Sequence, residues 1–289
     1  MERPPLTHHA LVHAPGRSPP SKWCIITNMQ NKILLNSGSL YNYGLNRFFE
    51  LASKAGYDGI ELIVDNNWDN RQSEYVKKLE KQYKIKVLSV HSAMEFVTCW
   101  GVDPRVRHKK SIELAKKIGA KHIVIHPHDY GDDSFYAWVK KNFREFIELA
   151  KPVKVTFENH TTRRSVAKND KKFFDVFPAY TLDTSHVATT KRNLIDVLDE
   201  VGGKLGHIHL SDSDFAKRSN LPELIDDRHM IPGTGKLPLK EFLQKLKEIK
   251  YSGFIVTEML PESIGAGQSD AEVLKNLKKA LSFVNKNLK

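Results

Sequence analysis

The chain has 289 residues, of which 40% are hydrophobic and 27% charged, and its formal net charge is +11. Its two cysteines, Cys24 and Cys99, are too few for a disulfide framework or an all-thiolate zinc site. No stretch approaches the roughly 20 apolar residues of a membrane span, and the first residues lack the apolar run of a signal peptide. We therefore expect a soluble, cytoplasmic protein with no membrane partner.

The first segment differs in composition from the rest of the chain. Residues 1–22 contain five prolines and no apolar periodicity, which predicts a disordered N-terminal tail. From residue 23 to residue 289, short Val- and Ile-rich runs alternate with longer amphipathic segments that carry Lys and Glu. This alternation indicates one domain of strand–helix units.

The expected elements follow one another along the chain without a break in the pattern. Strands are expected at Ile33–Asn36, Gly59–Ile63, Val87–His91, His122–His126, Val153–Glu158, Tyr180–Asp183, Gly206–Leu210 and Phe254–Glu258. Helices are expected at residues 44–55, 73–82, 104–118, 134–150, 171–177, 193–201, 238–250 and 270–289. Eight such units without a glycine-rich dinucleotide motif predict an α/β fold, a single (β/α)₈ TIM barrel spanning residues 23–289.

Ionisable residues fall at the ends of the expected strands. Five strands end on a His, Asp or Glu, and a seventh-strand histidine lies one residue before the end; these residues are His91, His126, Glu158, Asp183, Glu258 and His209. In a (β/α)₈ barrel the strand ends meet at one rim, where the catalytic groups of this fold are found. Buried carboxylates and imidazoles need a common partner, and a divalent cation is the simplest one.

Two further motifs add candidates to this rim. In Asp183-Thr184-Ser185-His186 the histidine lies one turn into the loop that follows the sixth strand. Asp227 and His229 point the same way from an extended segment that precedes a Pro-Gly-x-Gly turn. Mixed imidazole and carboxylate ligands suit Zn²⁺ best, with Mn²⁺ or Co²⁺ as alternatives.

The motifs VLSVH, IVIHPH, VTFENH, YTLDTSH, HIHLSDSD, DRHMIPGTG and IVTEML together resemble the xylose-isomerase-like barrel superfamily. That superfamily includes sugar isomerases and epimerases as well as endonuclease IV. The resemblance covers most of residues 32–289, and the order of the motifs is specific to the group.

The resemblance implies two ligand sets, one inside the other. Similarity to endonuclease IV implies up to three zinc ions, held by His91, His126, Glu158, Asp183, His186, His209, Asp227, His229 and Glu258. Similarity to the single-metal epimerases implies one ion, held by Glu158, Asp183, His209 and Glu258. In those epimerases the two residues that match Glu158 and Glu258 are the catalytic acid/base pair. The residues that match His186 and Arg228 bind the substrate.

Two reactions follow from the resemblance, and we expect the first. A metal-dependent sugar or sugar-phosphate isomerase/epimerase would move a proton between its two glutamates and a bound sugar. The segment Asn36–Leu62 is more similar to sugar isomerases than to the nuclease.

The alternative is a zinc-dependent phosphodiester hydrolase that acts on abasic-site DNA. The complete nine-residue set favours it, and so does the positive charge, although lysines on outer helices would give the same excess. Against it, Met94-Glu95 replaces the Tyr-Leu pair that the nuclease carries after its third-strand histidine, and a glutamate there would repel phosphates.

Overall fold

Eight parallel strands form a closed barrel in the computed structural model, which describes residues 31–94, 96–127, 133–159, 173–219 and 221–288. The strands follow one another around the barrel in the order β1-β10-β7-β6-β5-β4-β3-β2. They are β1 Ile33–Asn36, β2 Gly59–Ile63, β3 Val87–His91, β4 His122–Ile125, β5 Lys154–Glu158, β6 Tyr180–Asp183, β7 Leu205–Leu210 and β10 Phe254–Thr257. The predicted TIM barrel is therefore confirmed.

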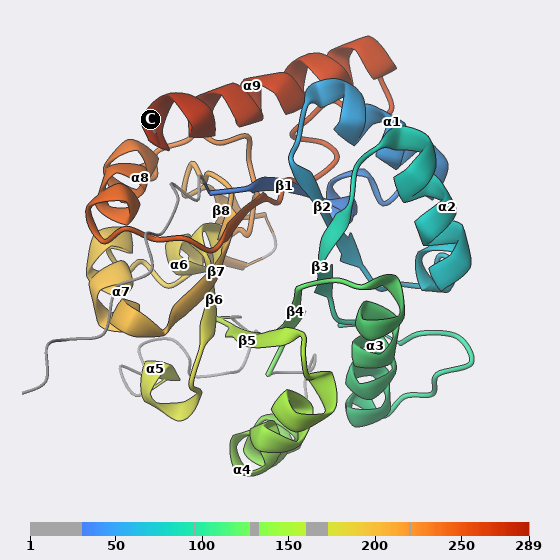
Figure 1. Ribbon diagram of the computed structural model, residues 1–289. Coiled ribbons are helices and arrows are strands. Elements are labelled where there is room, and N and C mark those ends of the chain that lie inside the picture. Colours follow the sequence, from blue (N-terminus) through green and yellow to red (C-terminus); the bar gives the residue numbers. More distant parts are fainter. Residues whose placement is uncertain (1–30, 95, 128–132, 160–172, 220, 289) are drawn as a thin grey trace, which may run out of the picture. The chain divides into compact units, whose positions relative to one another are not determined.

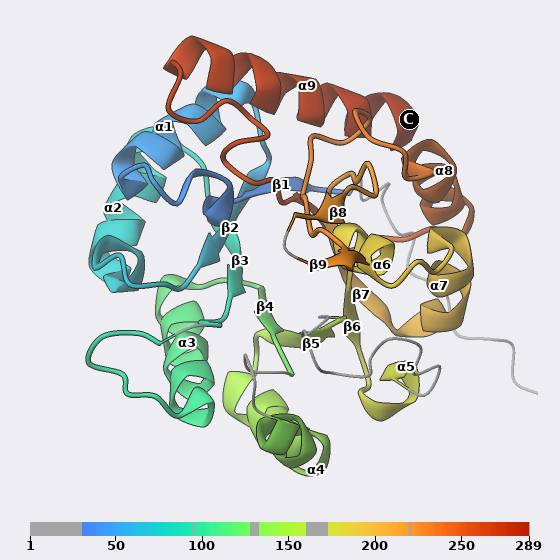
Figure 2. The ribbon, with the colours of Figure 1, turned by 180° about the vertical axis from the view of Figure 1, so that it is seen from behind.

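Helices surround the ring of strands, as the two opposite views of Figures 1 and 2 show. They are α1 Leu45–Ala55, α2 Ser73–Tyr83, α3 Pro104–Ile118, α4 Asp133–Ala150, α5 Phe173–Val176, α6 Thr184–Thr189, α7 Leu194–Val201, α8 Leu239–Glu248 and α9 Asp270–Leu288. Short 3₁₀ helices cover Ser37–Leu40, Asp69–Arg71 and Gly202–Lys204. No helix among these described residues is long and apolar enough to cross a membrane.

Two elements differ from the sequence expectation. Helix α6 replaces the loop that was predicted after the sixth strand, because the Asp183 side chain caps it by accepting a hydrogen bond from the His186 backbone N–H. A two-stranded antiparallel hairpin, β8 Lys217–Arg218 and β9 Leu221–Ile225, was not predicted. It lies on the end of the barrel that faces the viewer in Figure 2. The predicted boundary between residues 22 and 23 lies outside the described residues.

The barrel interior below the rim is polar, whereas branched apolar side chains usually fill this region. The rings of His122 and His207 stack with their centroids 4.1 Å apart and their planes 12° from parallel. Thr156 and Thr181 share a hydrogen bond of 2.5 Å in the same region. The Glu61 side chain also lies in this layer, where it contacts His207. It lies below the rim because β2 continues for two more residues, to Ile63. The aliphatic core lies instead between the strands and the helices.

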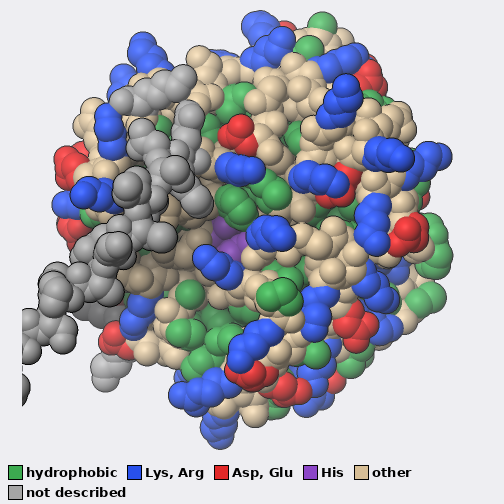
Figure 3. Space-filling model, in the orientation of Figure 1, with side chains coloured by type: hydrophobic (Ala, Val, Ile, Leu, Met, Phe, Trp, Pro, Cys, Tyr) green, Lys and Arg blue, Asp and Glu red, His purple; other side chains and the backbone are tan. Residues whose placement is uncertain are grey.

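A second cavity, of about 720 Å³, opens at the opposite end of the barrel, where the strands begin. His122 lies in its wall, and Lys154 and Lys250 lie among the residues around it. Figure 3 shows a face where Lys and Arg predominate and where histidine is visible at the bottom of a hollow. On this face, positively charged side chains therefore surround the hollow.

His108 of α3 is the basis of a first prediction, on stability. Its side chain is buried, Nδ1 lies 2.9 Å from Ser92 Oγ, and the ring stacks on Phe135. Burial, together with the nearby His126, lowers the pKa of His108 to about 3. In the unfolded chain His108 takes up a proton near pH 6.5, whereas in the folded chain it stays neutral at that pH. The free energy of unfolding therefore decreases as the pH falls below about 6.5, and His108 contributes up to about 1.4 kcal/mol per pH unit to this decrease.

Replacing His108 with Gln should flatten this slope while costing some stability at neutral pH through lost ring packing. Urea unfolding in the presence of chelator at several pH values between 5 and 8 measures both effects. Phe135→Leu is the matched control, because it removes the same packing and keeps the titrating ring. An equal pH slope in wild type and His108→Gln would show that His108 does not cause the loss.

Candidate functional site

All nine predicted metal ligands lie at the C-terminal end of the barrel. They come from strand ends or from the segments that follow them: His91 from β3, His126 after β4, Glu158 from β5, Asp183 from β6, His186 from α6, His209 from β7, Asp227 and His229 after β9, and Glu258 after β10. Six of them line a cavity of about 710 Å³, a size suited to a small molecule: His126, Glu158, His186, Asp227, His229 and Glu258.

Glu158, Asp183, His209 and Glu258 form the most compact group. One potential ligand atom from each lies within 4.8 Å of the others. His209 Nδ1 lies 2.8 Å from Glu158 Oε1 and 2.8 Å from Glu258 Oε2. Two carboxylate oxygens thus lie equally close to one imidazole nitrogen, and such a convergence of donor atoms is the arrangement that a metal ion needs.

Two more histidines approach the other oxygen of Glu158. His126 Nε2 lies 2.5 Å and His91 Nε2 lies 3.2 Å from Glu158 Oε2, and the two nitrogens are 3.1 Å apart. These three residues form a second group with metal-ligand spacing. Glu158 therefore belongs to both groups, with one oxygen directed to each.

A third group lies on the far side of Asp183. It consists of Asp183, His186 and His229. Asp227 joins the two histidines, since its carboxylate oxygens lie 3.2 Å from His186 Nε2 and 3.2 Å from His229 Nε2. The backbone of His229 has a φ of 34°, a conformation that non-glycine residues seldom adopt and that often marks a functional position.

The buried carboxylates of the site differ in how their charge is compensated. Burial raises the pKa of Asp183, and the neighbouring Glu158 and Glu258 carboxylates oppose its ionisation further. Burial also acts on Glu158, but His209 and His126 outweigh it and hold the pKa of Glu158 well below its usual range. Asp183 Oδ2 has no hydrogen-bond partner within the described structure. A buried carboxylate oxygen in that state is a suitable ligand for a metal ion.

The donor set fits a divalent metal. Imidazole nitrogens and carboxylate oxygens without thiolates suit Zn²⁺, Mn²⁺ or Co²⁺. The unpartnered Asp183 oxygen and the convergence on His209 Nδ1 both favour an ion among the four central side chains. The structure therefore has His, Asp and Glu clusters that can hold a metal, in line with the prediction from the strand ends.

Two residues that the sequence reasoning missed support the ligands. Asn159 Oδ1 accepts a hydrogen bond of 2.6 Å from the Asp183 backbone N–H, and Asn159 Nδ2 donates to the Asp183 carbonyl. The Asp212 carboxylate accepts backbone N–H bonds from Gly233, Gly235 and Leu237. It thereby fixes the turn that follows His229. The SDSD run gave no signal of this, because its partners lie more than 20 positions further along.

Arg228, which was predicted to bind substrate, lies apart from the cavity. It is not among the residues that line the cavity, and its guanidinium is 3.9 Å from Asp214 Oδ2. His186, the other predicted substrate ligand, does line it. The remaining wall is mostly apolar, with Asp65, Asn66 and Asn67 as a polar patch. Glu95 lies outside the described residues.

Comparison with protein families gives one match over most of the chain. The family model described as "Xylose isomerase-like TIM barrel" matches residues 49–285. An uncharacterized protein of Mycobacterium tuberculosis, Rv0498, is 28% identical over 291 residues, which cover 89% of this chain and 98% of that protein. The similarity thus extends along the whole barrel.

Two solved structures have a similar fold. A D-psicose 3-epimerase from Clostridium cellulolyticum H10, solved with D-tagatose, has a TM-score of 0.67 and 16% identity, over 89% of this chain and 99% of that one. The IOLI protein, solved with a zinc atom, has a TM-score of 0.66 and 23% identity, over 88% of this chain and 98% of that one. Because both sequence identities are below 25%, this similarity shows a shared fold and no more.

Proposed function

The chain belongs to the xylose isomerase-like TIM barrel family, and from that premise we propose that it is a divalent-metal-dependent sugar isomerase or epimerase. The observation that carries the proposal is the convergence of Glu158, Asp183, His209 and Glu258, whose ligand atoms lie within 4.8 Å of one another beside the cavity. The sugar epimerase and the zinc-containing protein of similar fold support both the substrate class and zinc as the metal.

In this proposal Glu158 and Glu258 have two roles, as ligands and as the acid/base pair. A bound metal would polarise the carbonyl and the adjacent hydroxyl of an open-chain sugar. Both carboxylates line the cavity and lie on either side of His209 Nδ1. One removes the proton from the substrate carbon and the other returns it, and return on the opposite face gives epimerisation. His186, which lines the cavity, would hold a sugar hydroxyl.

The cavity wall favours a neutral sugar over a phosphorylated one. The described residues that line it include no Lys or Arg, and Asp65 adds a carboxylate. Met94, Phe96 and Leu260 give one side of the mouth an apolar surface that limits water around the reacting carbon. The positive charge of the chain does not by itself indicate a phosphate at this site.

The reaction is tested with wild-type protein loaded with Zn²⁺, Mn²⁺ or Co²⁺. Ketohexoses, including D-tagatose and D-psicose, are incubated with it in deuterated water, and NMR follows both the appearance of an epimer and the loss of the carbon-bound proton. Metal-dependent exchange at one carbon supports the proposal. No exchange with any sugar tested, from protein shown to hold metal, would argue against it.

Phosphodiester hydrolysis at abasic DNA remains the second candidate, because eight of the nine predicted ligands lie in three groups with metal-ligand spacing and the ninth, Asp227, contacts His186 and His229. The test is incision of a duplex that contains one abasic site. Under this candidate wild type cuts the duplex in a salt-sensitive way, and His91→Ala abolishes cutting because it removes a ligand of an outer metal. Under the first proposal wild type leaves the duplex intact, and His91→Ala keeps sugar turnover because the four central ligands remain.

A further inference from the structure

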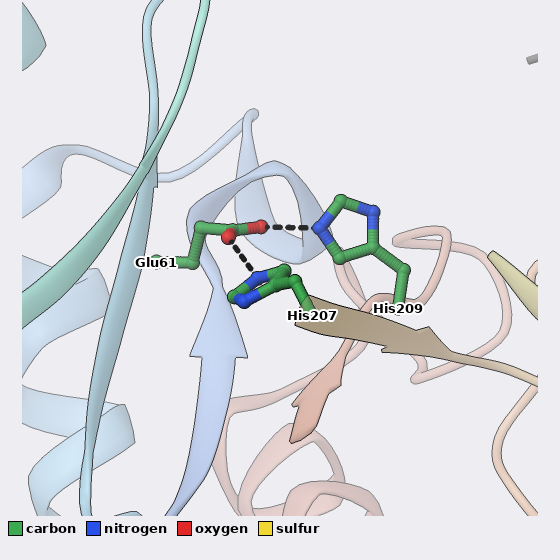
Figure 4. A group of neighbouring side chains, drawn as sticks. All are labelled: Glu61, His207 and His209. Carbon is green, nitrogen blue, oxygen red and sulfur yellow. Dashed lines mark hydrogen bonds and ion pairs between the residues drawn. The ribbon is translucent and has the colours of Figure 1, made fainter. Parts of the chain in front are cut away.

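A buried carboxylate lies directly behind the candidate metal ligand His209. Glu61 of β2 is fully buried inside the barrel, opposite the two histidines of β7 (Figure 4). Its Oε1 lies 2.8 Å from His209 Nε2, and its Oε2 lies 2.7 Å from His207 Nε2. Glu61 therefore pairs with the nitrogen of His209 that faces away from the cavity.

Two further donors complete the environment of Glu61. Asn36 Nδ2 donates a hydrogen bond of 2.9 Å to Oε1, and Ser89 Oγ donates one of 2.6 Å to Oε2. Oε2 thus has two hydrogen-bond partners, Ser89 and His207, and Oε1 has the Asn36 hydrogen bond and the ion-pair contact with His209 Nε2. Glu61, His207 and His209 are spaced closely enough to hold an ion, but the Glu61 carboxylate is already held by these contacts. It lies at the centre of a buried polar network.

This network gives the two nitrogens of His209 different tasks. Nε2 faces Glu61, whereas Nδ1 faces Glu158 and Glu258 at 2.8 Å from each. A ligating histidine generally donates its other ring N–H to an acceptor, which fixes the tautomer and the orientation of the ring. A ring held in this way has its Nδ1 lone pair directed at the metal position.

We propose that Glu61 is a positioning residue of the metal site: it holds the His209 ring so that Nδ1 is the atom that binds the metal. The proposal rests on the proposed metal-dependent function. The location of Glu61 supports it, because a fully buried charge at a barrel position where an aliphatic side chain would pack costs stability unless it serves another group.

The test is Glu61→Gln, which keeps the size and shape of the side chain but replaces one carboxylate oxygen by an amide that cannot accept. The affinity for Zn²⁺ is measured by competition with a chelating dye, and Co²⁺ absorption reports the ligand geometry. We expect the Zn²⁺ affinity to fall about 10- to 100-fold and the Co²⁺ spectrum to change. The melting temperature of the metal-free variant is measured alongside, so that a loss of stability is not mistaken for a loss of affinity.

Ser89→Ala is the matched control. It removes one donor from Oε2 and leaves the contact between Glu61 and His209, so its Zn²⁺ affinity should stay within about twofold of wild type. Glu61→Asp replaces Glu61→Gln if the latter does not fold. Its shorter side chain keeps the charge but withdraws from His209, so it too should bind Zn²⁺ more weakly than wild type.

The outcomes separate this proposal from the proposed function. Wild-type affinity and an unchanged Co²⁺ spectrum in Glu61→Gln would overturn the role of Glu61 and leave the metal site standing. Lower stability of the metal-free variant with unchanged affinity would assign Glu61 to the fold alone, which also overturns it. A wild type that binds neither Zn²⁺ nor Co²⁺ would overturn the metal site and the role of Glu61 together.

Discussion

Glu258→Gln is expected to reduce exchange of the substrate's carbon-bound proton with deuterated water by at least about 100-fold, because general acid–base groups contribute rate factors of this size. Glu258 lines the cavity, and Gln keeps its shape but cannot take up a proton at neutral pH. His209 counters the effect of burial and lowers the pKa of Glu258, so the wild-type side chain is ionised and ready to act as a base. The measurement is NMR of the sugar after incubation in deuterated water.

Glu262→Gln is the matched control for this experiment. It makes the same chemical change at an exposed position in the segment that follows β10, and it should exchange as wild type does. Metal content is measured alongside, so that loss of the ion is not mistaken for loss of the base. Wild-type exchange by a metal-loaded Glu258→Gln would remove Glu258 from the acid/base pair.

The affinity for Zn²⁺ is expected to rise at least tenfold per pH unit between pH 6 and pH 8. Burial opposes protonation of His186, but Asp183 and Asp227 outweigh it and raise the pKa of His186 to about 10. Glu158 and Glu61 likewise overcome burial and hold the pKa of His209 well above its usual range. The metal-free site therefore carries protons at neutral pH, and an ion has to displace them. Each proton displaced makes the affinity tenfold stronger per pH unit.

Chelator competition at pH 6, 7 and 8 measures this dependence. His108→Gln should show the wild-type slope, because His108 lies outside the ligand groups. Elemental analysis of protein never exposed to chelator comes first, and absence of metal there would contradict the site. An affinity that is the same at pH 6 and pH 8 would show that the ligands are not protonated in the metal-free chain. The carboxylates around the rings extend this dependence above the ordinary histidine pKa of about 6.5.

The barrel itself could be predicted because its signal is local. Each strand is a short apolar run bounded by polar residues, and left-handed glycines end α1 and α3 at Gly56 and Gly119. The helix predicted at residues 238–250 was too long, since Lys250 has a φ of 53° and α8 ends at Glu248. The left-handed conformation of Lys250 could not be predicted, because it does not change the spacing of apolar residues along the helix.

The ligands could be placed at one rim because the fold gathers strand ends, but their pairing could not. The division of Glu158 between His209 on one side and His91 and His126 on the other depends on side-chain rotamers across four strands. Glu61 lies below the cavity, since two further strand residues separate it from the rim. Asp212 gave no sequence signal at all.

The four central side chains come from strands that are neighbours in the barrel wall, in the order β5, β6, β7 and β10. An ion held by Glu158, Asp183, His209 and Glu258 would therefore act as a cross-link along one half of the wall, between segments up to 100 positions apart in the chain. Because such binding opposes local opening, amide hydrogen exchange would slow in those four strands and not in β1 and β2. A second ion at His91 and His126 would extend the protection to β3 and β4, so the boundary of slow exchange around the ring would report how many ions the barrel holds.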